Sequence, residues 1–385
     1  MENPARRIAI NFGGGYVPGL NSVVTGVVLA ASQLGWEVVG IRDGFDGLLF
    51  PDRYPEGGLV TLTPTLVENL AGAGGCILGT AARSDPFHVR TINAENMVEE
   101  VDRSDELLGV IQKEKIDTVI SVVGARALSI LWKLSRKGLK TVCVPKSVEN
   151  DVAATMLSFG FNSGLSFVAD MLERCRQAAQ SARRVGVVEV LGEHAGWLAL
   201  QAGMAVCADA VLIPEIPYDL RKVALKLREK ATAGRGFGLV VVAEGAKPLA
   251  GLGGAAKTLD APMKAALSPG AAGGESFHVM DRSGQAAAEV ALEIQRLTDQ
   301  ETTPLVLGQL AKGGTPTVVD RQLGLGYGAG AVRALEAGRS GVMVVFQPPD
   351  LKFVPMNEAI NQVRTVPADS ELIHIARALG ISLGD

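Results

Sequence analysis

Short apolar segments recur along the chain at intervals that suit alternating strands and helices. Each is about three to six residues long, and most are rich in β-branched side chains, as in strands buried on both faces of a parallel sheet. These segments are Ile8–Phe12, Val38–Ile41, Thr118–Val123, Thr141–Val144, Val185–Val190, Ala210–Ile213, Leu239–Ala243, Leu305–Leu307 and Val342–Phe346. Most are followed by a turn and then by apolar residues spaced three or four apart, as in Asn21–Leu34 and Leu165–Ala179. The pattern predicts an α/β fold with parallel sheets.

Composition narrows the class of protein. The chain has 385 residues, 47% hydrophobic and 20% charged, which is enough apolar material for two subdomains. A net charge of −4 and an aromatic content of 5% argue against a nucleic-acid-binding protein. We find no 18-residue apolar run and no signal-peptide pattern, so neither a membrane span nor secretion is expected. Four cysteines without a CxxC pair favour a reduced, cytoplasmic setting.

The first strand ends in a glycine run that suits an anion. Gly13, Gly14 and Gly15 follow the strand and precede a predicted helix, where backbone N–H groups can approach a phosphate. The run is not GxGxxG followed by a ribose-binding carboxylate, so it gives poor support to a dinucleotide site. A tight strand–helix turn without a ligand is the alternative.

A second polar run follows the strand Thr141–Val144. Lys146, Ser147, Glu149 and Asp151 stand at its carboxyl end, which is where open α/β sheets bind ligands. The alternative is a helix cap, supplied by Ser147 or by the neighbouring Asn150.

Two later segments also carry candidate chemistry. Glu189 lies inside an apolar strand, where a carboxylate is rare unless it is paired. His194 follows that strand and is either a general base or a structural histidine. A further glycine-rich run at 308–316 is followed by Asp320 and Arg321, which could form a structural salt bridge.

In this order, these segments resemble the motifs of the phosphofructokinase family over nearly the whole chain. The resemblance is carried by GGGYVPGLN at 13–21, RDGFDGL at 42–48, LGTAARSDPF at 78–87, PKSVEND at 145–151, LGEHAGW at 191–197, GQLAKGGTP at 308–316 and RTVPADSELIHIARALGISLGD at 364–385. Lys146 resembles the pyrophosphate-using branch, which has a lysine at this point.

The resemblance implies a set of site residues. Glu149 stands in the position of the catalytic base, with Asp151 beside it. The residues expected to bind the phosphoryl donor are Gly14, Gly15, Arg83, Arg126, Lys146 and Ser147. The residues expected on the sugar-phosphate side are Arg184, Gly192, Glu193, His194, Glu244, Gln309 and Lys312.

The chain differs from the family where metal and phosphate would bind. Ala125 replaces the aspartate that helps to hold Mg²⁺, and alanine cannot ligate a cation, so no metal site is expected. Arg126 stands where pyrophosphate users have Asp and ATP users have Gly. The other replacements are Tyr16 for Asp, Glu193 and Thr303 for Arg, Gln309 for His and Lys312 for Arg.

Because several stabilising charges are lost together, we expect a ligand-binding or regulatory paralogue without ordinary phosphotransfer. It would bind a small anion and assemble with itself or with an active homologue. The alternative is an active phosphotransferase that uses Mg²⁺ with ATP or pyrophosphate on fructose 6-phosphate or another sugar. In a further alternative, Glu149, Asp151, Glu193 and His194 form an acid–base cluster for a different substrate. The last alternative is a scaffold protein whose clefts bind no ligand.

The resemblance also implies two α/β subdomains with a cleft between them. The donor-side subdomain would comprise 1–145 and 310–365, the sugar-phosphate side 146–309, and a C-terminal extension 366–385. The segment Gly245–Glu275, rich in Gly, Ala and Pro, is predicted to be an extended or mobile surface loop. A homodimer or homotetramer is expected, with Arg184 near a subunit contact, unless Arg184 simply opens the strand that follows it.

Arg126 is the last residue for which the sequence makes a specific prediction. Its planar guanidinium suits phosphate, which it could bind without Mg²⁺. We favour the other outcome, in which Glu149 or Asp151 forms a salt bridge with Arg126 and closes the site.

Overall fold

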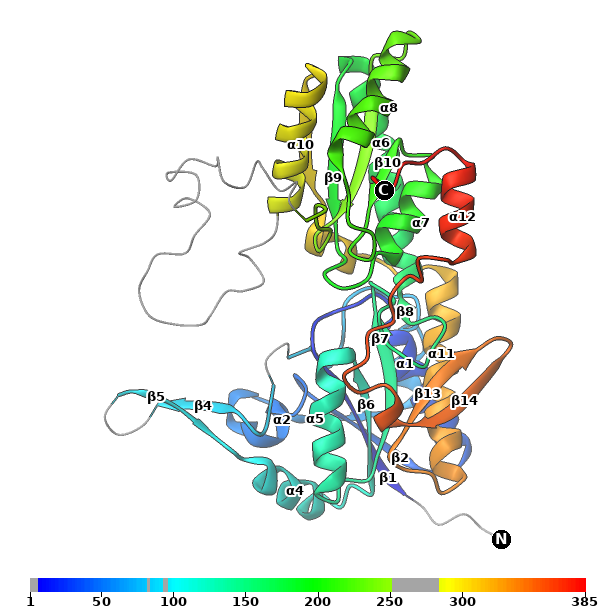
Figure 1. Ribbon diagram of the computed structural model, residues 1–385. Coiled ribbons are helices and arrows are strands. Elements are labelled where there is room, and N and C mark those ends of the chain that lie inside the picture. Colours follow the sequence, from blue (N-terminus) through cyan, green and yellow to red (C-terminus); the bar gives the residue numbers. More distant parts are fainter. Residues whose placement is uncertain (1–5, 82–83, 93–95, 251–283) are drawn as a thin grey trace. The chain divides into compact units, whose positions relative to one another are not determined.

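The computed structural model describes residues 6–81, 84–92, 96–250 and 284–385 (Figure 1). The chain forms two compact units: unit 1 comprises Met1–Ser163 and Lys312–Arg364, and unit 2 comprises Gly164–Ala311 and Thr365–Asp385. Residues 146–163 thus belong with unit 1 and the C-terminal segment with unit 2. The subdomain limits and the cleft inferred from the resemblance stay predictions.

Unit 1 is built on an eight-stranded sheet in the order β14-β13-β7-β6-β1-β2-β3, with β8 paired to β7. Its strands are β1 (Arg7–Gly13), β2 (Glu37–Ile41), β3 (Leu59–Leu62), β6 (Thr118–Val123), β7 (Thr141–Ser147), β8 (Phe159–Gly160), β13 (Val342–Gln347) and β14 (Asp350–Pro355). The central strands run parallel, and β3 and β14 are antiparallel at the two edges. β6 and β7 are buried along their whole length, and their central residues are mostly apolar.

Helices complete unit 1, and close packing between two of them depends on glycine. The helices are α1 (Leu20–Gln33), α2 (Asp46–Leu49), α3 (Pro64–Val67), α4 (Ser104–Lys113), α5 (Ala125–Arg136) and α11 (Val318–Glu336). A Cβ atom on Gly26 of α1 would lie 2.4 Å from the carbonyl oxygen of Leu325 in α11. These two helices can therefore approach closely only because that position lacks a side chain. A two-stranded antiparallel sheet, β4 (Val89–Ile92) with β5 (Val98–Val101), also belongs to this unit.

Unit 2 has a parallel four-stranded sheet in the order β10-β11-β9-β12. Its strands are β9 (Val185–Val190), β10 (Ala210–Leu212), β11 (Gly238–Ala243) and β12 (Thr302–Val306), and its helices are α6 (Phe161–Ala182, which begins in unit 1), α7 (Trp197–Ala205), α8 (Leu220–Thr232), α10 (Gln285–Thr298) and α12 (Glu371–Ala378). Figure 1 shows α8 and α10 beside the strands, and their apolar residues pack on the sheet in one core.

The α/β class and its mainly parallel sheets are confirmed. The strand predicted at Leu305–Leu307 is not buried: among the described residues β12 pairs only with β9, and its last three residues are exposed. Most of the predicted loop Gly245–Glu275 lies outside the described residues. Among the residues that were described, no helix is long and apolar enough to cross a membrane.

Candidate functional site

The glycine run forms an open loop between β1 and α1. Gly13 is the last residue of β1 and pairs in register with Val123, the last residue of β6. Gly14 has a φ of 79°, a backbone conformation that glycine adopts without strain. A Cβ atom on Gly14 or Gly15 would meet nothing within 4 Å, so the backbone there is open to an approaching ligand. This geometry fits the predicted anion-binding loop.

Lys146 holds this loop in place. It belongs to β7, only 3% of its surface is exposed, and its Nζ donates hydrogen bonds to the carbonyl oxygens of Gly15 (2.5 Å) and Gly14 (3.4 Å). Burial lowers the pKa of Lys146 to about 7; Cys76 opposes this shift and the charge of Lys312 adds to it. The lysine therefore anchors the loop through its carbonyl groups, while the Gly14 N–H donates to the Ala81 carbonyl (3.3 Å).

The residues after Lys146 form an internally bonded loop. The Ser147 hydroxyl donates to Oδ1 of Asp151 (2.5 Å) and accepts a hydrogen bond from the Glu149 N–H (3.0 Å). Asn150 has a φ of 55° and is 3% exposed; its Oδ1 accepts from the Ser158 N–H (2.9 Å) and its Nδ2 donates to the Met156 carbonyl (3.3 Å). No helix begins here, so the alternative of a helix cap is wrong: Asn150 stabilises a turn that leads into β8. We call residues 147–151 the carboxylate loop.

Arg364, which was not among the predicted site residues, contacts the carboxylate loop. Its backbone N–H donates to the Asp151 carbonyl (2.8 Å), and its Nη1 donates to the Asn150 carbonyl (3.3 Å). Burial lowers the pKa of this half-buried guanidinium. Arg364 begins the C-terminal segment that carried part of the family resemblance, which was the one available signal for it.

Arg126 lies in the first turn of α5, which begins at Ala125 after the N-cap residue Gly124. A cation is unfavourable at a helix N-terminus, where the helix dipole favours an anion. The exposed guanidinium would therefore gain from a negatively charged ligand. The predicted pairing of Arg126 with Glu149 or Asp151 stays a prediction, and Arg83 lies outside the described residues.

The side chains near the turn at Gly124–Arg126 supply few oxygen atoms that could bind Mg²⁺. The turn at Gly124–Arg126 offers no side-chain oxygen, and Asp151 already accepts a hydrogen bond through Oδ1. Within the described parts of the chain no three His, Cys, Asp or Glu side chains gather as a metal-binding group. The residues at the turn therefore do not fit a Mg²⁺ held there by the protein.

Tyr16, in place of the family's aspartate, links two other loops of unit 1. Its hydroxyl accepts a hydrogen bond from the Gly75 N–H (2.8 Å) and donates to the Gly314 carbonyl (3.4 Å). Burial raises the pKa of Tyr16, so the phenol stays neutral. The residue thus has a structural contact that does not depend on a ligand.

In unit 2 the predicted residues Gly192, Glu193 and His194 share one turn after β9. Gly192 has a φ of 146°, and its N–H lies 3.5 Å from Oε1 of Glu244. The side chain of His194 is 57% exposed, and its Nε2 lies 4.0 Å from the Glu193 carboxylate. Glu215, which the sequence analysis did not consider, accepts from the N–H groups of Gly196 (2.9 Å) and Val366 (2.8 Å) and so fixes the end of this turn.

Two candidates are accounted for by structural contacts. Glu189 accepts hydrogen bonds from the N–H groups of Gly284 (2.6 Å) and Ala287 (2.9 Å), so it caps α10. The suggested salt bridge between Asp320 and Arg321 is not observed: Asp320 accepts from the N–H and hydroxyl of Ser163 (2.7 and 2.6 Å). Arg321 donates instead to the carbonyl of Pro316.

The remaining predicted residues lie around β12. Arg184 precedes β9, is 47% exposed and forms a 2.7 Å ion pair with Glu301. Gln309 and Lys312 belong to one 3₁₀ turn, Gly308–Lys312. Arg184 is therefore accessible for the predicted subunit contact, which stays a prediction.

The amino-acid sequence is similar to those of known proteins along its whole length. A family model described as phosphofructokinase matches residues 7–335. The chain is 36% identical over its full length to an ATP-dependent 6-phosphofructokinase of Chloroflexus aurantiacus, covering 99% of that protein, and 33% identical to ATP-dependent 6-phosphofructokinase 2 of Clostridium perfringens, covering all of it.

Solved structures agree with the fold. A pyrophosphate-dependent phosphofructokinase from Nitrosospira multiformis superposes with a TM-score of 0.72 at 19% identity, covering 98% of this chain and 91% of that one. The phosphofructokinase of Saccharomyces cerevisiae superposes with a TM-score of 0.71 at 24% identity, covering 97% of this chain and 46% of that one. At these identities the superpositions bear on the fold alone.

Proposed function

The chain belongs to the phosphofructokinase family, and from that premise we propose that it transfers a phosphoryl group from ATP to fructose 6-phosphate. Full-length relatives that are named ATP-dependent 6-phosphofructokinases favour this activity over the regulatory paralogue expected from the lost charges. One observation carries the proposal: Lys146, which leads directly into the carboxylate loop, is hydrogen-bonded to the glycine loop. The strands that bear the two loops, β7 and β1, both pair with β6.

Each loop has a distinct part in the proposed reaction. Backbone N–H groups of the glycine loop, other than the Gly14 N–H that donates to Ala81, bind phosphate oxygens of the donor. The Glu149 carboxylate accepts the proton of the sugar hydroxyl as that oxygen attacks the terminal phosphorus. The bond between that phosphorus and the bridging oxygen breaks, and ADP leaves with the bonding electrons. The Ser147 hydroxyl, which donates to Asp151 and accepts from the Glu149 N–H, keeps the loop that bears Glu149 in one conformation.

The proposed steps use no metal ion held by the Gly124–Arg126 turn, because the residues of that turn do not fit one. The negative charge on the donor phosphates still has to be stabilised during transfer. Arg126 supplies a permanent positive charge in the first turn of α5, next to the strand end that pairs with Gly13. We therefore assign Arg126 to the donor phosphates.

A second candidate is an anion-binding protein without phosphotransfer. The replacement of the metal-holding aspartate by Ala125, with Arg126 beside it, favours this candidate. Pyrophosphate as the donor is a variant of the first proposal, and it is favoured by the presence of Lys146.

A coupled assay with fructose 6-phosphate, Mg²⁺ and either ATP or pyrophosphate separates these functions. The proposal predicts ATP-dependent turnover within the range of about 1–100 s⁻¹ that is typical of kinases. Turnover with pyrophosphate but not with ATP would identify pyrophosphate as the phosphoryl donor. No turnover with either donor, together with a raised melting temperature in phosphate, would leave the anion-binding protein as the function.

The family premise also leads us to propose a homodimer or homotetramer with Arg184 at or near a subunit contact. The exposed ion pair of Arg184 with Glu301 would then lie close to the interface. Light scattering of the wild type and of Arg184→Ala tests this proposal, which predicts a smaller species for the variant. An unchanged mass for the variant, or a monomeric wild type, would contradict it.

A further inference from the structure

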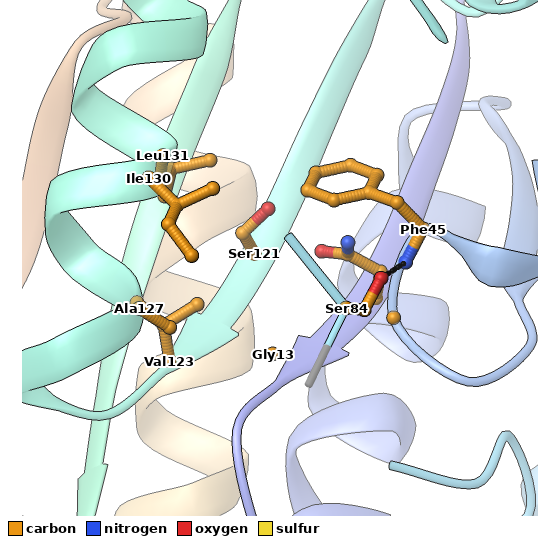
Figure 2. A pocket seen from close by; sticks show the side chains of 10 residues that line it. Gly13, Phe45, Ser84, Ser121, Val123, Ala127, Ile130 and Leu131 are labelled. Atoms are coloured by element: carbon orange, nitrogen blue, oxygen red, sulfur yellow. Dashed lines mark hydrogen bonds between the residues drawn. The ribbon is translucent and has the colours of Figure 1, made fainter. Parts of the chain in front are cut away.

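A small cavity lies inside unit 1 below the glycine loop. It has a volume of about 20 Å³ and is lined by residues of β1, β6, α5 and the segments that contain Phe45 and Ser84. Figure 2 shows Ile130 and Leu131 of α5 on one side, Phe45 on the other, and Ser121 of β6 between them. The walls are therefore mostly apolar, with a few polar atoms among them.

Two of these polar atoms have no hydrogen-bond partner among the described residues. They are Oδ1 of Asn11 and Oγ of Ser121, and each residue is only 1% exposed. Asn11 and Ser121 are register partners on the adjacent strands β1 and β6. Buried side-chain polar atoms in proteins are nearly always hydrogen-bonded to protein or to ordered water. Two such atoms on paired residues beside one cavity point to a shared partner.

We propose that this cavity binds one ordered water molecule, which bridges Asn11 and Ser121. About 10–15 Å³ of such volume is enough for a water molecule, and a buried water makes two to four hydrogen bonds. The water donates to Oδ1 of Asn11 and exchanges a hydrogen bond with the Ser121 hydroxyl. Oγ of Ser84 already accepts from the Phe45 N–H (3.2 Å), so its own proton is available for a third bond.

The wall chemistry argues against a metal ion in the same place. Three neutral oxygen atoms on an otherwise apolar wall provide neither the number nor the charge of ligands that a hard cation requires. They match the needs of a single water molecule. A dry cavity would leave both strand residues unpaired.

The position of this water gives it a structural consequence. Asn11 precedes Gly13 by two residues, and Ser121 precedes Val123 by two, so the bridge lies just before the strand ends that carry the glycine loop and the turn into α5. It joins these strands through their side chains. Any effect of the bridge on donor binding rests on the proposed function, whereas the water site itself does not.

A high-resolution crystal structure of the wild-type chain is the direct test. We expect one water peak within hydrogen-bond distance of Asn11 Oδ1 and Ser121 Oγ. A direct bond between those two atoms, an empty cavity, or a peak with the coordination of a metal ion would each overturn the proposal. None of these outcomes depends on whether the chain phosphorylates a sugar.

Variants give a second, independent readout. Asn11→Leu and Ser121→Ala each leave the other polar atom with a water that has lost one partner, so each should lower the melting temperature. The double variant removes both polar partners, and its loss should be smaller than the sum of the two single losses. Ser32→Ala, which removes a hydroxyl bonded within α1 to the Leu29 carbonyl, is the matched control and should be additive with Ser121→Ala. Additive losses in the Asn11–Ser121 pair would refute a shared water.

Discussion

Replacing Lys146 by methionine should stabilise the fold at neutral pH while it weakens the site. Burial lowers the pKa of Lys146 from 10.5 to about 7. Above pH 10.5 the amine is neutral in both the folded and unfolded states, so it adds no pH dependence. Between pH 10.5 and 7 the unfolded chain binds a proton that the folded chain does not. Stability therefore falls as the pH is lowered through this range and is constant below it.

The magnitude follows from the size of the shift. At about 1.36 kcal/mol per pH unit, the shift corresponds to a penalty of at most about 5 kcal/mol at pH 7. Lys146→Met removes that penalty but also loses the bonds to Gly14 and Gly15, worth about 1–3 kcal/mol in total. At pH 7 the variant should therefore be more stable than the wild type, by at most about 2–4 kcal/mol. Near pH 10.5 only the lost bonds remain, and the variant should be the less stable protein.

Denaturant unfolding of both proteins at a series of pH values from 7 to 10.5 measures this crossover. Lys140→Met is the control, because Lys140 is an exposed lysine just before the same strand and its replacement should leave the pH dependence unchanged. Lys146→Met should also bind phosphate about 10–100 times more weakly than the wild type, since the glycine loop loses its anchor. Parallel pH curves for the wild type and Lys146→Met would refute the reasoning.

Substitutions of Glu149, Asn150 and Gly26 test the proposed base, the carboxylate loop and the packing of α1 on α11. Glu149→Gln should lower kcat about 10²–10⁴-fold with little change in KM, measured by steady-state kinetics; an unchanged kcat would remove Glu149 from the base role. Asn150→Ala should cost about 2–4 kcal/mol of unfolding free energy in denaturant titrations, because two buried bonds and a favoured left-handed turn are lost. Gly26→Ala should lower it by at least about 2 kcal/mol through its clash with Leu325, whereas Gly109→Ala in α4, where a Cβ meets nothing, should raise it by up to about 1 kcal/mol.

The α/β pattern was predictable because strands buried on both faces leave a clear apolar signature. β6, at Thr118–Val123, has the predicted limits. Edge strands give a weaker signal: β12 was expected to be buried, although it stands at the end of its sheet in the strand order of the described residues. The two-stranded sheet β4–β5 went unpredicted because it is largely exposed and leaves no clear apolar pattern: all four residues of β5 are exposed, and in β4 only Val89 is buried.

For the candidate site, the sequence identified the loops but not how they are held. Lys146 was predicted as a donor-binding residue, whereas its Nζ bonds the loop carbonyls, a contact between residues that are about 130 positions apart. Arg364 and Glu215 were missed for the same reason, since their roles arise from tertiary contacts with backbone groups. The glycine run, by contrast, was informative because glycine marks positions where backbone conformation and ligand approach exclude a side chain.

Transfer of the labelled γ-phosphate of ATP to fructose 6-phosphate tests the central claim most directly. The proposed function predicts labelled sugar bisphosphate at a rate within about 1–100 s⁻¹, and a loss of labelling in Glu149→Gln. Absence of labelled sugar with a folded wild-type chain that binds phosphate would contradict it.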